Sequence, residues 1–168
     1  MFDLKPITAD AVPAAVEKAN RYHLLNEPEQ AVSICEDVLR IDPDHQEALV
    51  TLLLAHTDRF DDPRPASPQA ARGLLPRLHG EYERAYYAGI VWEREGIAWL
   101  RSGKPRAGRT AYHCLREAMD CYGRAEAIRP AANDDALLRW NSCVRFIQAH
   151  PDLVPDDDRH EVAASLGE

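Results

Sequence analysis

Apolar residues recur every three or four positions through residues 10–43, which is the spacing of a helical face. The positions fall into two sets: Ala15, Ala19 and Tyr22, then Ala31, Ile34, Cys35 and Val38. A polar turn at residues 26–28 separates the sets, and Pro43 ends the second. The pattern predicts two helices packed as a hairpin, with Asp10 as the N-cap of the first and Pro28 at the start of the second.

The remainder of the chain also predicts helices. These are a helix from Asp44, a short helix over residues 68–79 kinked at Pro76, a long helix over 81–101, a helix that ends before Pro130, and a last helix from Asn133 to Ala149. A Pro- and Asp-rich insertion between Thr57 and Pro68 and a break at residues 102–105 interrupt them. On the last helix we expect Arg139 and Arg145 to stay in water, while an apolar face covers the preceding hairpin. That face comprises Leu137, Trp140, Val144 and Ile147.

The hairpin pattern returns later in the chain. The distance from Ala118 to Pro130 equals that from Ala31 to Pro43, and an isoleucine stands two residues before each proline. These anchors resemble the tetratricopeptide repeat (TPR) family, whose pattern W-x2-L-G-x2-Y, A-x3-F and P falls on Ala15, Lys18, Ala19, Tyr22, Ala31, Cys35 and Pro43. The resemblance implies an all-α fold: a right-handed superhelix of about three TPR-like helical hairpins plus a C-terminal capping helix. It also implies a helical domain over residues 1–150. The three consecutive aspartates at 156–158 and the low apolar content predict an acidic, flexible tail over residues 151–168.

In the TPR family the first helices of the hairpins line a concave groove that holds a peptide or a partner's helix. The resemblance therefore implies a non-enzymatic adaptor or scaffold. Projected onto this chain, the groove comprises Val16, Asn20, His23, Val50, Leu54, Thr57, Glu93, Ile97 and Leu100. Relatives that grip chaperone tails need lysines where Val16, Val50 and Glu93 stand. A mostly apolar groove instead favours a protein or peptide with an apolar or amphipathic segment, and self-association is compatible with it.

Composition and charge narrow the class of protein. The chain has 168 residues, of which 45% are hydrophobic, and its longest aliphatic run, residues 48–55, is too short to span a bilayer. We therefore expect a cytoplasmic protein that does not bind membranes. The net charge of −8 argues against nucleic-acid binding. It is uneven: −7 over residues 1–71, +4 over residues 72–130 and −5 over residues 131–168, which indicates either self-complementary packing or an anionic partner for the middle.

A second interpretation is a small all-helical enzyme or ligand-binding protein with a polar site near His79, His113, Glu117 and Asp120. The last three share one helical face and could offer metal ligands, although solvated faces commonly show this spacing. With no HExxH motif and no second ligand pair, we expect no metal, cofactor or catalytic residue. A closed pocket of convergent polar groups would favour this interpretation, whereas an open apolar groove would favour the adaptor.

Two residue clusters complete the candidate chemistry. Arg101, Lys104, Arg106 and Arg109 surround the break before the next helix, whose free N–H groups could help to hold an anion. Gly103-Lys104 is not part of a phosphate loop, because proline follows the lysine. The cysteines Cys35, Cys114, Cys121 and Cys143 form no CxxC pair, and we expect them to be reduced and mostly buried.

Overall fold

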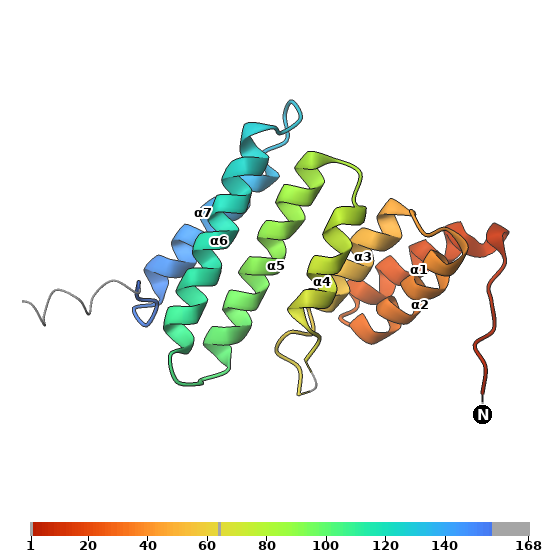
Figure 1. Cartoon of the computed structure of the whole chain (residues 1–168), viewed down its shortest axis with the longest axis horizontal. Helices are drawn as coiled ribbons and strands as arrows, with labels where there is room; N and C mark the ends of the chain where they lie inside the picture. The colour runs from red at the N-terminus through yellow and green to blue at the C-terminus, as the bar shows by residue number, and fades with distance from the viewer. Residues whose placement is uncertain (1, 64, 156–168) are drawn as a thin grey trace, which may run out of the picture.

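The computed structural model describes residues 2–63 and 65–155, and all regular structure in those ranges is helical (Figure 1). The helices are α1 (Val12–Leu24), α2 (Pro28–Ile41), α3 (Gln46–Thr57), α4 (Pro68–Leu74), α5 (Glu81–Arg101), α6 (Ala107–Ala127) and α7 (Asp135–Ala149). Two single-turn 3-10 helices, η1 (Ala9–Ala11) and η2 (Leu75–Arg77), precede α1 and follow α4. The predicted all-α class is confirmed. Most of the predicted acidic tail, residues 156–168, lies outside the described residues.

Prolines place the helix starts close to where the sequence predicts them, but Asp10 is not the N-cap of α1. It lies within η1, and the N-cap is Ala11, which makes no side-chain capping hydrogen bond. Pro28 and Pro68 are the first residues of α2 and α4, where a missing backbone N–H costs nothing. The expected kink at Pro76 is a change from α-helix to the 3-10 turn η2. Asn133, the expected N-cap of α7, stands one residue before the observed N-cap, Asp134. Its Oδ1 atom still accepts a hydrogen bond from the N–H of Asp135, the first residue of α7, at 3.0 Å.

Consecutive helices pack against each other, and α3 also touches both α1 and α5. Figure 1 shows the helices side by side in chain order, from α1 and α2 at one end to α7 at the other. The first predicted hairpin face is confirmed, since Ala19, Ala31, Cys35 and Val38 are fully buried. A second core lies between α5, α6 and α7 and includes Leu115 and Tyr122.

The four cysteines are free thiols buried in these cores, as predicted. Burial raises the pKa of Cys35, Cys114 and Cys143 to about 12, and nearby carboxylates add to the effect. These thiols are therefore protonated and poorly nucleophilic at neutral pH, which fits a packing role.

The helix α7 packs partly through the predicted face. Val144 and Ile147 pack against the second core as expected, but Trp140 is 39% exposed. The most deeply buried residues of the helix are Ala136 and Cys143. The expectation that Arg139 stays in water is wrong, because its guanidinium lies 3.1 Å from a carboxylate oxygen of the buried Glu93. The physical reason is that Glu93 needs a cation when it is removed from water. The small residues Ala136 and Cys143, about one turn before and after Arg139, let α7 approach closely.

The buried imidazole of His56 on α3 predicts a pH-dependent stability. Its Nδ1 atom has no hydrogen-bond partner among the described residues. Burial lowers the pKa of His56 below 6.5, and repulsion by Arg59 adds to this, with a smaller opposing effect from Glu36. Between the lowered pKa and 6.5 the unfolded chain binds more protons than the folded one, so stability falls as the pH falls through that window.

The measurement is urea unfolding at pH 7 and pH 5 for the wild type and for His56→Gln. We expect the wild type to lose more of its free energy of unfolding between these pH values than the variant loses, because glutamine does not titrate. An equal loss in both proteins would show that His56 does not contribute to the pH dependence.

Candidate functional site

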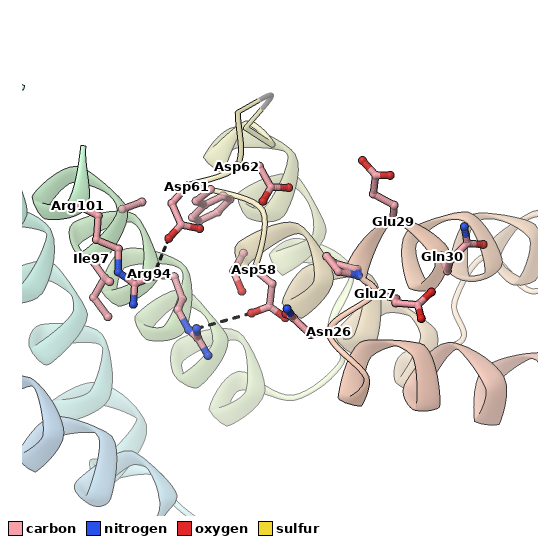
Figure 2. Close-up of a pocket in the computed structure, with 14 residues that line it drawn as sticks. Asn26, Glu27, Glu29, Gln30, Asp58, Asp61, Asp62, Arg94, Ile97 and Arg101 are labelled. Carbon is pink, nitrogen blue, oxygen red and sulfur yellow. Dashed lines mark hydrogen bonds and ion pairs between the residues drawn. The ribbon is translucent and has the colours of Figure 1, made fainter. Parts of the chain in front are cut away.

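A surface groove of about 600 Å³ lies between the ends of the first hairpins and the second half of α5 (Figure 2). Three segments line it: residues 26–30 at the turn into α2, residues 57–62 after α3, and residues 94–101 of α5. These segments are far apart in the sequence, and the fold brings them together.

The groove exists because α5 is longer than the helix beside it. The α5 helix has 21 residues and α3 has 12. Asp58, directly after α3, lies 3.7 Å from Arg94, and Asp61, three residues later, pairs with Arg101. Residues 95–101, about 10 Å of helix, therefore lie alongside the segment that follows α3. This overhang forms one wall of the groove.

The predicted insertion after Thr57 forms the facing wall, and ion pairs hold it in place. Asp61 binds Arg101 of α5 at 2.6 Å, and Arg59 lies 3.3 Å from Glu29 of α2. A backbone hydrogen bond from the N–H of Ala66 to the carbonyl of Arg59 closes the insertion on itself. Phe60 anchors it, because its ring is buried in the core beneath. The insertion is therefore a fixed part of the groove.

The groove combines an apolar floor with a charged rim. Ile97 and Ala98 of α5, with Phe60, supply the apolar surface. The rim carries five carboxylates and two guanidinium groups: Glu27, Glu29, Asp58, Asp61 and Asp62, with Arg94 and Arg101. Figure 2 shows Arg94 and Arg101 extending from the same helix, α5, toward Asp58 and Asp61 of the segment that follows α3.

The nine residues predicted to line a partner groove fall in several places. Thr57 and Ile97 line the groove described above, although the Thr57 hydroxyl is turned inward and donates to the carbonyl of Leu54 at 2.7 Å. Val16 and Asn20 line a smaller hollow of about 250 Å³ beside α1. His23 contacts Asp58 at 2.8 Å.

Several of the nine residues pack within the protein. Val50 and Leu54 contact the first core, and Leu100 contacts the second. Val16, Thr57 and Glu93 are buried, so they present little surface to a partner. The role of the nine residues in binding stays a prediction, and Ile97 has the best position for it.

The predicted anion-binding residues are partly engaged with groups of the protein itself. Arg101 binds Asp61, and the Nζ atom of Lys104 lies 5.4 Å from the centre of the Trp99 ring. Arg106 is exposed and takes a left-handed conformation, with φ of +64°, at the N-cap of α6. Arg109 lies in the first turn of α6 and also takes part in a polar or electrostatic contact. The pairing of Arg94 and Arg101 with acidic residues of the first half supports self-complementary packing of the basic middle.

The polar residues of the second interpretation do not gather around one pocket. His79 is exposed in the loop before α5, whereas His113 of α6 stacks edge-on against Trp92 at 6.1 Å. Trp92 lies eleven residues into α5, so the two histidines are separated by about 16 Å along that helix. Within the described ranges, no group of three His, Cys, Asp or Glu residues could hold a metal ion.

A buried polar cluster centred on Glu93 was not predicted from the sequence. The hydroxyl of Tyr122 donates to its Oε2 atom at 2.6 Å, and Arg139 donates to its Oε1 atom at 3.1 Å. The Cys143 thiol is a third donor. Burial, with the neighbouring carboxylate, raises the pKa of Tyr122 far above its ordinary value. Both carboxylate oxygens are thus occupied, and the cluster joins α5, α6 and α7. Glu93 falls at the helical spacing of Ile90 and Gly96, and an acid on this apolar face is the signal that could have revealed the cluster.

Comparison of the chain with protein-family models, with curated proteins and with solved structures finds no match. No helix in the described part of the chain is both long and apolar enough to cross a membrane.

Proposed function

We propose that this protein is a non-enzymatic adaptor of the TPR type, which binds a peptide or helix of a partner protein in a groove. The observation that carries the proposal is the groove beneath the α5 overhang. Its rim is solvent-exposed at Asn26, Gln30 and Arg101, and its floor presents Ile97 and Ala98. An apolar strip flanked by polar groups suits a segment with aliphatic anchors.

The order of helix contacts supports a superhelix of TPR-like hairpins, which is part of this proposal. Each hairpin packs on the next, and, among alternate helices, α3 touches both α1 and α5. A right-handed superhelix of TPR-like hairpins needs both kinds of contact, and α7 then takes the place of the capping helix. The four buried, unpaired thiols fit the reducing cytoplasm, which we include in the proposal.

The burial of Glu93 further favours an adaptor over an enzyme. A catalytic carboxylate must be accessible to its substrate, whereas Glu93 is buried and each of its oxygens accepts a hydrogen bond from the protein. Exposed polar groups lie on the groove rim, where they can contact a bound segment.

Substitution of Ile97 by aspartate tests the groove. A phage-displayed library of 16-residue peptides is panned on the wild-type chain, and the selected peptides are measured by fluorescence anisotropy. We expect affinity for Ile97→Asp to fall at least tenfold, or about 1.4 kcal/mol, because a carboxylate replaces an apolar contact of the bound segment.

Leu138→Asp is the matched control, since Leu138 is 62% exposed on α7 and lies away from the groove. Helical circular dichroism of both variants shows whether the fold is kept. If the selected peptides bind Ile97→Asp as tightly as the wild type, the groove is not the binding site.

A further inference from the structure

The charged groove adjoins a second hollow with different chemistry. This hollow, of about 360 Å³, lies on the other side of the insertion and shares Phe60 and Ala98 with the groove. Its lining includes the Trp99 ring, Pro65 and Pro68, with one cation, Lys104. A segment that follows this surface would pass from an aromatic and proline-lined hollow into a carboxylate-lined groove.

The groove keeps an excess of negative charge after its own ion pairs are counted. Arg94 and Arg101 pair with Asp58 and Asp61. Arg59 is shared by Glu29 and Asp62, so one positive charge serves two carboxylates. Glu27, which is exposed, adds a further negative charge to the rim. The surrounding chain makes the potential at the groove more negative, because residues 1–71 carry a net charge of −7.

We infer that the groove binds a cationic amphipathic segment of a partner protein, with an apolar side chain in the Trp99 hollow and lysine or arginine over the carboxylates. This inference rests on the proposed function and specifies its partner. Charge complementarity carries it, since the groove repels acidic segments and attracts basic ones. The chain's own tail is an unfavourable occupant: residues 156–168 hold five Asp and Glu against one Arg.

The test uses three labelled peptides that share the same leucine anchors and carry lysine, glutamine or glutamate at the remaining polar positions. Fluorescence anisotropy measures their binding to the full chain at 50 mM and 300 mM NaCl, concentrations chosen to span about a twofold change in Debye length. We expect the lysine peptide to bind at least tenfold more tightly than the glutamine peptide at low salt, and to lose most of that advantage at high salt. The glutamate peptide should not bind measurably.

A variant that lacks rim charge tests whether the carboxylates of the groove cause the preference for the lysine peptide. Glu27→Gln removes an exposed rim charge that makes no ion pair with the insertion, and we expect it to weaken the lysine peptide about threefold while leaving the glutamine peptide unchanged. The control, Glu36→Gln, removes the same charge from an exposed position outside the groove and should leave both peptides unchanged.

The outcomes separate this inference from the proposed function. Equal, salt-independent binding of the lysine and glutamine peptides, lost in Ile97→Asp, would overturn the cationic partner and keep the adaptor. Binding of every peptide that is insensitive to Ile97→Asp, or absent, would overturn both. Self-association in the ultracentrifuge that weakens in Glu27→Gln would identify a second copy as the occupant and overturn the assignment to another protein.

Discussion

Replacing Arg139 with methionine is expected to lower the free energy of unfolding by about 3 kcal/mol, because it leaves the buried Glu93 without its cation. The side chain of Glu93 is 8% exposed and that of Arg139 is 31% exposed. Since water reaches part of the guanidinium, the expected loss lies at the lower end of the range for breaking a buried pair. Urea unfolding measures it, and hydrogen exchange should show that α7 loses protection first.

A second substitution separates charge from packing. In Glu93→Gln/Arg139→Met the glutamine oxygen still accepts the hydrogen bond of Tyr122, but no buried charge remains. We therefore expect the double variant to be more stable than Arg139→Met alone. Arg145→Met, on an exposed position of the same helix, should change stability by less than about 0.5 kcal/mol. If Arg139→Met loses no more stability than Arg145→Met, the ion pair does not hold α7 in place.

The positions of the helices could be predicted closely from the sequence, whereas the face that α7 turns inward could be predicted only in part. Apolar spacing, proline positions and caps are local signals, and they predict α5 at Glu81–Arg101 to the residue. The inward face of α7 is set by a partner on α5, since Glu93 draws Arg139 inward and turns Trp140 toward solvent. No signal within α7 itself carries that information.

The segments that form the groove could be predicted from the sequence, but their arrangement in space could not. The insertion after Thr57 and the long third hairpin are visible in the sequence as departures from the repeat spacing. Their combined effect depends on how far α5 projects beyond α3, which the Asp58–Arg94 contact defines in three dimensions. Of the nine residues projected onto a partner groove, Ile97 and Thr57 line the observed one, whereas Asp61 and Arg101 were not among them, because they belong to the added segments.

Substitution of Gly89 by alanine is expected to destabilise the protein by about 2 kcal/mol, although alanine favours helices. Gly89 lies in the middle of α5 against the ring of Tyr122. A Cβ atom there would stand 2.6 Å from Cδ1 and 2.9 Å from Cζ of that ring, well inside van der Waals contact. The ring cannot move aside, because Tyr122 is fully buried and its hydroxyl is bound to Glu93. Either α5 and α6 separate, or the hydrogen bond to Glu93 breaks.

The same substitution at Gly123 of α6 is the matched control. The Cβ atom there would meet nothing within 4 Å, so only the intrinsic preference acts, and Gly123→Ala should raise stability by about 0.5–1 kcal/mol. The two variants are compared by urea unfolding under identical conditions. Opposite signs would show that close approach of α5 to α6 at Tyr122 sets the requirement for glycine. A stabilised Gly89→Ala would mean that the two helices are not held this closely, and the packing of Glu93, Tyr122 and α7 would have to be looser than the structure has it.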